Sequence, residues 1–320
     1  MRRAEGRVVA LSGGIGGAKL ALGLSRVMPA ADLMVVVNTA DDFEHLGLAI
    51  SPDLDTVMYA LAGLDDPRRG WGRRDETWTF MSALAALGGD SWFALGDADL
   101  ATHIERTRRL RMGERLSTIT ADLCRRLGIT ARVVPMSDDR VRTRLDTDRG
   151  VLDFQDYFVR QRCAPVVREI VYAGAAMARA HADALAVLRD PGLRAVVICP
   201  SNPLLSIEPM LAIPELRAAI AGCAAPVIAV SPIIGGRAIK GPTAKMMAEL
   251  GLPATAGAVA RRYAGLLDGY VLDHADAPEA AVLDIPVRTA KALMTTLADR
   301  EQLAREALAH ADGRADAAQR

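Results

Sequence analysis

Short apolar runs, many of them β-branched, alternate along the chain with longer stretches rich in alanine and leucine. The short runs predict strands at residues 8–11, 33–37, 131–135, 195–199, 226–230 and 270–272. The longer stretches predict helices at residues 18–27, 53–62, 76–86, 98–110, 117–126, 175–188, 210–221, 244–249, 256–266 and 290–310. Because the two kinds of segment alternate, we expect an α/β fold with a doubly wound, mainly parallel, Rossmann-like sheet.

The pattern changes between about residues 133 and 190. Residues 141–145 alternate polar and apolar side chains, Asp148-Arg149-Gly150 is typical of a turn, and residues 151–154 return as a second short run. This predicts a hairpin. We therefore expect a single α/β domain over residues 1–320, with a small antiparallel and helical insertion at about 133–190. The tail after about residue 309 is rich in Ala, Arg and Asp, and we expect it to fray.

Charge and cysteine content exclude several classes of function. The 320 residues include 39 Lys and Arg against 39 Asp and Glu, so no overall field attracts nucleic acid or an anionic membrane. Arginines at 106, 108, 109 and 111 are spaced as on the solvent face of a helix. No apolar stretch approaches the roughly 20 residues that span a bilayer, and the four cysteines form no metal-binding pair. We expect a cytoplasmic protein that binds neither nucleic acid nor membrane.

A glycine turn follows the first predicted strand. Ser12-Gly13-Gly14-Ile15-Gly16-Gly17-Ala18-Lys19 joins that strand to a helix, a form in which backbone N–H groups can hold a phosphate. The turn fails the dinucleotide pattern, because its third glycine would fall on Lys19, and it lacks the Gly-Lys-Ser/Thr of a P-loop. The candidate anion-binding residues are Gly13, Gly14, Gly16, Gly17 and Lys19.

Two acidic segments follow within a short distance. Asn38-Thr39-Ala40-Asp41-Asp42 ends the second predicted strand, and Pro52-Asp53-Leu54-Asp55-Thr56 opens a helix. Mg²⁺ prefers one or two carboxylates together with phosphate oxygens, so Asp42, Asp53 and Asp55 are candidate metal ligands and Asn38 a candidate substrate contact. Asp53 is also suited to cap the helix, and both roles can hold together, but we favour the functional role for these acids. Ligands of open α/β sheets bind beyond the carboxyl ends of the strands.

Three further polar segments lie at predicted strand ends or helix starts. They contain Asp97 with Thr102 and His103, then Ser201 with Asn202, and finally Ser231. Each is a candidate substrate-binding residue, although Ser, Asn and Asp also form turns and caps without any ligand. Aromatic residues at 154, 157 and 158 and the three tryptophans are either core or one wall for a flat ligand, and we expect core for each.

These segments, in this order, resemble the 2-phospho-L-lactate transferase family of deazaflavin coenzyme F-420 biosynthesis. The resemblance rests on the glycine turn, Val37-Asn38-Thr39-Ala40-Asp41-Asp42, Pro52-Asp53-Leu54-Asp55-Thr56-Val57-Met58-Tyr59, Gly70-Trp71-Gly72, Leu95-Gly96-Asp97, Ala101-Thr102-His103, Pro135-Met136-Ser137-Asp138-Asp139, Phe154-Gln155-Asp156-Tyr157, Pro200-Ser201-Asn202-Pro203 and Ser231-Pro232-Ile233-Ile234-Gly235. It extends from Val8 to about Leu272.

The resemblance implies a Mg²⁺-dependent transfer by a homodimer. The implied donor is a guanosine diphosphate ester of a three-carbon acid, and the acceptor is the ribityl hydroxyl of 7,8-didemethyl-8-hydroxy-5-deazariboflavin, with GMP released. Residues 13–17 would then seat phosphate, Asp42 with Asp53 or Asp55 would hold Mg²⁺, and the serines 201 and 231 with Asn202 would lie near guanosine. Asp53 and the turn at Thr102-His103 would face the deazaflavin, and Asp42 and Asp53 are the catalytic candidates. The acid could be derived from lactate, phosphoenolpyruvate or phosphoglycerate.

Two other functions stay open. A related family with a similar glycine turn and Asp-Asp strand end binds nucleotide sugars and acts in metabolic regulation. This chain differs from it in Pro52-Asp53-Leu54-Asp55-Thr56, Gly70-Trp71-Gly72 and Phe154-Gln155-Asp156. A dinucleotide-dependent oxidoreductase is disfavoured by the missing third glycine and by Asn38 and Thr39, which stand where an acid would bind ribose.

Overall fold

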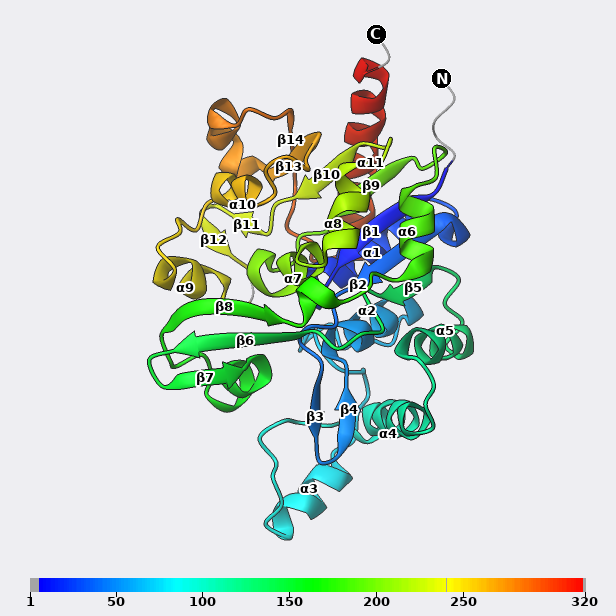
Figure 1. Ribbon diagram of the computed structural model, residues 1–320, viewed down its shortest axis with the longest axis vertical. Coiled ribbons are helices and arrows are strands. Elements are labelled where there is room, and N and C mark those ends of the chain that lie inside the picture. The colour runs from blue at the N-terminus through cyan, green and yellow to red at the C-terminus, as the bar shows by residue number, and fades with distance from the viewer. Residues whose placement is uncertain (1–5, 240, 319–320) are drawn as a thin grey trace.

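A parallel sheet forms the centre of the molecule. The structure, a computed structural model, describes residues 6–239 and 241–318 (Figure 1). In the described residues the sheet has seven strands in the order β14-β13-β10-β9-β1-β2-β5, and every neighbouring pair is parallel. The strands are β1 (Val8–Ser12), β2 (Leu33–Val37), β5 (Arg132–Pro135), β9 (Ala195–Ile198), β10 (Val227–Val230), β13 (Gly269–Asp273) and β14 (Val287–Ala290). The predicted fold class is confirmed.

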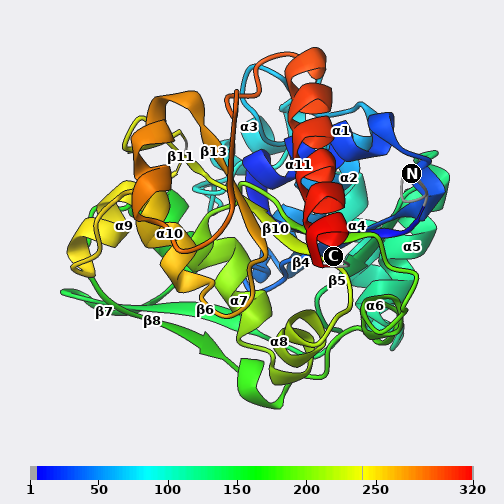
Figure 2. The same ribbon diagram turned by 90° about the horizontal axis from the view of Figure 1, so that it is seen from above.

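Helices cover both faces of the sheet, and each face has its own core. On one side lie α1 (Gly14–Val27), α2 (Pro52–Ala62), α5 (Leu116–Arg126) and α11 (Leu297–Ala318). On the other lie α6 (Ala182–Leu188), α7 (Glu208–Leu211), α8 (Pro214–Ala221), α9 (Thr243–Glu249) and α10 (Ala256–Arg262) (Figure 2). Successive strand residues point to opposite faces, so Val8 packs in the first core and Val9 in the second. Both faces are buried, which explains the nearly continuous apolar strands.

Smaller elements extend from the carboxyl end of the sheet. A three-stranded antiparallel sheet, in the order β7-β6-β8, consists of β6 (Arg142–Thr147), β7 (Gly150–Asp153) and β8 (Val167–Ala173). The hairpin of β3 (Phe43–His45) and β4 (Leu48–Ile50) lies beside α4 (Asp97–Arg111), with α3 (Thr79–Ala86) farthest from the sheet (Figure 1). A short hairpin joins β11 (Ile233–Ile234) to β12 (Arg237–Ala238). The antiparallel sheet contains the expected hairpin, whereas β5 belongs to the main sheet.

Four sequence-based boundaries were wrong, each because of a tertiary contact or a proline. The helix expected at 175–188 is one 3₁₀ turn followed by α6, since His181 donates its N–H to the carbonyl of Met136 and holds the intervening chain extended. Pro214 divides the helix expected at 210–221, because proline lacks the N–H that a continuing helix needs. The helix expected at 290–310 begins only at Leu297, since Ala290 is the last residue of the strand β14, which pairs with β13. The tail expected to fray after residue 309 is helical to Ala318, with Ala311 and Ala315 buried.

Candidate functional site

A cavity of about 590 Å³ lies at the carboxyl ends of the central strands. Its walls come from the glycine turn after β1, the first turns of α2, and the residues that follow β9 and β10. Aromatic side chains line another part of the same cavity. This is the position at which open parallel sheets bind ligands.

The glycine turn packs against neighbouring backbone and side chains more closely than any side chain would allow. A Cβ atom would lie 2.5 Å from Asp53 Oδ2 if added at Gly13, 2.2 Å from the Pro200 carbonyl oxygen at Gly16, and 2.4 Å from Ser201 Oγ at Gly17. The N–H groups of Gly13 and Gly14 donate to Ser201 Oγ and Asp53 Oδ1, at 3.1 and 2.7 Å. Ile15 and Gly16, in the first turn of α1, also line the cavity, and N–H groups of a first helical turn lack intrahelical acceptors.

Asp53 is fixed between the glycine turn and Asn38. Its Oδ1 accepts the Gly14 N–H, and its Oδ2 accepts from Asn38 Nδ2 at 3.0 Å. Asn38 also donates to the carbonyl of Leu205 at 3.1 Å, so it joins the loops after β2 and β9. Burial raises the pKa of Asp53 to about 6, although these hydrogen bonds act to lower it. Asp53 faces the cavity, while Asn38 lies behind it as a support.

Asp41 and Asp42 extend the acidic end of the cavity. Asp41 lines the cavity, and the Asp42 carboxylate accepts from Ser51 Oγ at 2.8 Å. Burial, and then repulsion from Asp53, raises the pKa of Asp41 well above its usual value; burial raises the pKa of Asp42 to about 7. The sequence pointed to Asp42, but Asp41 is the one that faces the cavity.

Unpaired polar atoms are concentrated at this acidic end. Oδ1 of Asp41 and Oδ1 of Asp42 are buried without a hydrogen-bond partner among the described residues, as are Ser12 Oγ, Thr143 Oγ1 and Arg142 Nε. Buried polar atoms in folded proteins nearly always have a partner. Carboxylate and hydroxyl oxygens are the ligands that Mg²⁺ prefers. The donor set and its unpaired oxygens therefore fit a hydrated divalent cation.

Asp55 is bound by an arginine. Arg106, from α4, is 1% exposed, and its two Nη atoms donate to the two carboxylate oxygens of Asp55. His103 lies between Asp55 and Asp99, with Nδ1 3.6 Å from Asp55 Oδ2 and Nε2 3.3 Å from Asp99 Oδ2. The expectation that Arg106 lies on a solvent face was wrong. Its partner lies 51 residues earlier, so no local pattern could reveal it.

The other predicted residues divide into two groups. Lys19, Ser201, Asn202 and Ser231 line the cavity; Lys19 Nζ donates to the Met294 carbonyl at 2.8 Å, and Asn202 Oδ1 accepts the N–H groups of Leu204 and Leu205. Gly17, Asn38, Asp42, Asp97 and Thr102, all described, lie outside the lining. Asp97 accepts from Thr77 Oγ1 and from the N–H groups of Thr79 and Phe80, so it anchors the start of α3. Thr102 instead contacts the Tyr59 hydroxyl, which lies 2.9 Å from Thr102 Oγ1.

The end of the cavity away from the glycine turn is aromatic. Its lining includes Tyr59, Trp71, Trp92, Phe93, Phe154 and Phe158. The rings of Phe154 and Phe158 are stacked with centroids 5.3 Å apart, and Trp92 and Phe93 meet edge to face at 5.7 Å. The sequence favoured core over ligand wall for residues 154, 157 and 158 and the three tryptophans. Of these, Trp71, Trp92, Phe154 and Phe158 line the cavity that His103 also lines, whereas Trp78 and Tyr157 do not.

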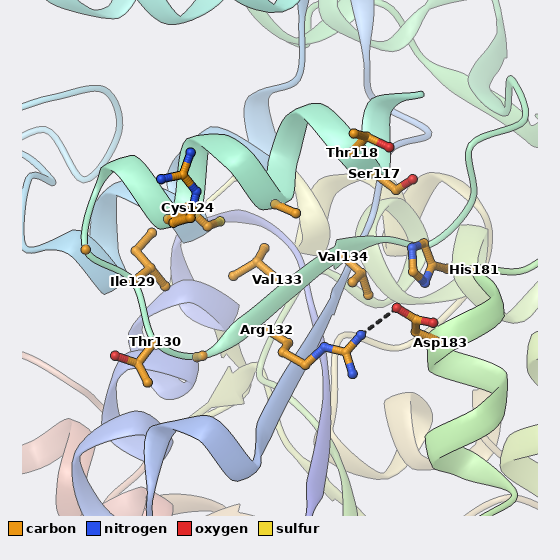
Figure 3. A pocket seen from close by; sticks show the side chains of 14 residues that line it. Ser117, Thr118, Cys124, Ile129, Thr130, Arg132, Val133, Val134, His181 and Asp183 are labelled. Carbon is orange, nitrogen blue, oxygen red and sulfur yellow. Dashed lines mark hydrogen bonds and ion pairs between the residues drawn. The ribbon is translucent and has the colours of Figure 1, made fainter. Parts of the chain in front are cut away.

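A second cavity, of about 710 Å³, lies between α5 and the edge strand β5. Figure 3 shows Cys124, Ile129 and Val133 inside it, and an ion pair between Arg132 and Asp183 at one side. No predicted site residue lines it. The chemistry therefore belongs to the first cavity.

Comparison with known proteins identifies the family. The model of the family described as 2-phospho-L-lactate transferase CofD matches residues 8–312. The chain belongs to this family. A phosphoenolpyruvate transferase of Streptomyces coelicolor is 42% identical over 315 residues, covering 96% of this chain and 98% of that protein. The phosphoenolpyruvate transferase of Mycobacterium leprae is 40% identical over 311 residues, covering 88% and 93%.

Family and relatives together make the protein a transferase of coenzyme F-420 biosynthesis. Among solved structures, a UPF0052 family protein of Bacillus halodurans matches with a TM-score of 0.64 and 13% identity, over 95% of this chain and 99% of that chain. At that identity the likeness concerns the fold alone.

None of the described helices has the length and apolar character that crossing a membrane requires.

Proposed function

We propose that the protein transfers an enolpyruvyl phosphate group from a guanosine diphosphate ester to the ribityl hydroxyl of 7,8-didemethyl-8-hydroxy-5-deazariboflavin, releasing GMP. The observation that carries this proposal is one cavity with a glycine turn and buried carboxylates at one end and aromatic side chains at the other. The first end suits a diphosphate, and the second suits a flat ring system. Enolpyruvyl is preferred over lactyl and phosphoglyceryl because the relatives are named phosphoenolpyruvate transferases.

The donor would lie with its diphosphate against the first turn of α1. Ser201, Asn202 and Ser231 line the same side and would contact the guanosine. Asp53 and Asp42, together with Asp41, would hold Mg²⁺, which supplies neutralisation of the diphosphate and of the charge that develops on departing GMP. Asp55 is a weaker ligand candidate, because its carboxylate already accepts from Arg106.

The acceptor would lie against the aromatic side chains and His103. Its hydroxyl oxygen forms the new bond to the phosphorus that carries the acid, while the bond from that phosphorus to the bridging oxygen of GMP breaks. The hydroxyl proton passes to one of the buried carboxylates that does not hold the metal. Positioning and charge neutralisation carry phosphoryl transfer, so no nucleophilic side chain is needed.

The test is a transfer assay with three donors. Purified protein, Mg²⁺ and the deazariboflavin are mixed in parallel with the enolpyruvyl, lactyl and phosphoglyceryl esters of guanosine diphosphate, and chromatography follows GMP and new anionic deazaflavin. We expect both products, fastest with the enolpyruvyl donor. Binding of a nucleotide sugar without turnover of any donor would replace this proposal with the regulatory function.

We further propose a cytoplasmic homodimer. Light scattering on the purified protein tests the dimeric state.

A further inference from the structure

A buried polar network connects α2 to α4 behind the acceptor end of the cavity. The α2–α4 network consists of Asp55, Tyr59, Asp99, His103 and Arg106. The Tyr59 hydroxyl donates to Asp99 Oδ1 at 2.6 Å, His103 lies between Asp99 and Asp55, and Arg106 closes the series through Asp55. All except Arg106 line the cavity. Arg106 therefore acts on the cavity only through its neighbours.

Arg106 is the only arginine or lysine of this network, and its guanidinium stays protonated. Burial acts to lower its pKa, but the charge and hydrogen bonds of Asp55 outweigh burial and raise it. Nη1 also lies 3.3 Å from His103 Nδ1 and 3.5 Å from the Ala49 carbonyl. One guanidinium thus joins the first turn of α2, the strand β4 and the helix α4.

The guanidinium also gives different partners to two carboxylates that stand two residues apart in the first turn of α2. Asp53 accepts from the glycine turn and Asn38, whereas Asp55 accepts from Arg106 on both oxygens. Ligand atoms of Asp55, Asp99 and His103 lie within 4.8 Å of one another beside this guanidinium. A histidine nitrogen and two carboxylates at that spacing are a donor set for a divalent transition metal.

We propose that Arg106 is a positioning residue that keeps Asp55, Asp99 and His103 from forming a second cation site beside the catalytic acids. With Arg106 in place, the wall presents His103 and the Tyr59 hydroxyl toward the acceptor, and the cation binds only at the acids next to the glycine turn. Removing the guanidinium leaves the buried carboxylate of Asp55 without its cation, close to Asp99. The added negative charge in the cavity then weakens binding of the anionic donor, and the two carboxylates bind metal in a nonproductive position. This inference rests on the proposed function for its kinetic consequence, but its metal-binding consequence needs no substrate.

The test measures Mn²⁺ alone. Equilibrium binding followed by electron paramagnetic resonance should give one Mn²⁺ per wild-type chain, and a second Mn²⁺ per chain in Arg106→Gln. The matched control Asp55→Asn/Arg106→Gln should return to one Mn²⁺ per chain, because it removes the carboxylate that was released. Circular dichroism checks that each variant is folded. A folded Arg106→Gln that binds Mn²⁺ as the wild type does would overturn the proposal.

Kinetics supply a second readout that a purely structural role would not move. We expect the KM for the donor to rise about tenfold or more in Arg106→Gln. In the double variant this KM should fall back toward the wild-type value, although the double variant carries one more substitution. A donor KM in the double variant as high as in Arg106→Gln would also overturn the proposal. If Arg106→Gln does not fold, Arg106→Met, which also removes the charge, replaces it: a second Mn²⁺ per chain in the folded variant supports the proposal, and wild-type stoichiometry contradicts it. If the wild type transfers nothing, the proposed function fails while the Mn²⁺ stoichiometry still decides this inference.

Discussion

Adding one methyl group to the glycine turn, with Gly16→Ala, should disable the donor end of the cavity. The new Cβ would lie 2.2 Å from the Pro200 carbonyl oxygen and 3.4 Å from its carbonyl carbon. This oxygen belongs to the backbone that follows β9, so it cannot rotate away as a side chain would. The glycine turn and the loop containing Ser201 must therefore separate by about an ångström.

The stability cost follows from overpacking, and the catalytic cost from misplacement. Forcing an extra carbon into a packed site costs about 1–3 kcal/mol. For a chain of this size, each kcal/mol lowers Tm by roughly 2–4 °C, so the variant should remain folded at 25 °C. A displacement of about 1 Å in a positioning element can reduce the rate about a hundredfold. We therefore expect a modest fall in Tm and a much larger fall in kcat/KM.

The assay combines thermal unfolding, GDP binding by calorimetry and GMP release. Gly313→Ala is the matched control, since Gly313 is exposed in α11 and a Cβ there would meet nothing within 4 Å. Alanine at that position should stabilise the helix by about 0.5–1 kcal/mol and leave activity unchanged. A Gly16→Ala variant that binds GDP and turns over as the wild type does would refute the close packing described for the turn.

Three further predictions concern the two ends of the cavity. Burial raises the pKa of Asp42 to about 7 and of Asp53 to about 6, so between about pH 4 and pH 7 the folded protein holds protons that the unfolded chain has released. The free energy of unfolding should therefore fall as pH rises through this window, and Mg²⁺ should raise Tm more at pH 8 than at pH 5; equal increments at both pH values would contradict this. Asp53→Asn should lower the rate of GMP release about a hundredfold or more, because it removes a catalytic carboxylate. The variant should stay folded, because the lost carboxylate repels Asp41 in the wild type; a wild-type rate of GMP release would exclude the proposed role. Trp92→Ala should raise the KM for the deazaflavin severalfold with little change in the KM for the donor. Steady-state kinetics with each substrate varied in turn measures both values. A rise in the KM for the donor instead would show that the two ends of the cavity were assigned wrongly.

The fold was largely predictable because its determinants are local. Apolar strands and amphipathic helices can be recognised from spacing alone, and the ends of parallel strands meet at one edge of the sheet. That is why the glycine turn, Asp53 and Ser201 could be placed near one another from the sequence. The strand β14 could not be predicted, since its pairing with β13 rather than its own pattern determines its conformation.

The rest of the site depends on contacts between distant residues. Arg106 belongs to a helix whose other arginines are exposed or partly exposed, and only the buried carboxylate of Asp55 explains its burial. The choice between Asp41 and Asp42 likewise had no local signal, because a loop has no fixed period to show which side chain faces the ligand. Asp97 was predicted to bind substrate but anchors α3, a role that Asp often takes at helix starts.

The central claim is that one cavity holds both substrates, the donor at the glycine turn and its neighbouring carboxylates and the deazaflavin at the aromatic end. It is tested most directly by a crystal structure with GDP, Mn²⁺ and the deazariboflavin, with the metal located by its anomalous signal. The account predicts the Mn²⁺ peak beside Asp41 and Asp53, the diphosphate against the first turn of α1, and the deazaflavin ring against Trp92 and Phe154. A Mn²⁺ peak between Asp55 and His103, or a deazaflavin bound outside this cavity, would contradict it.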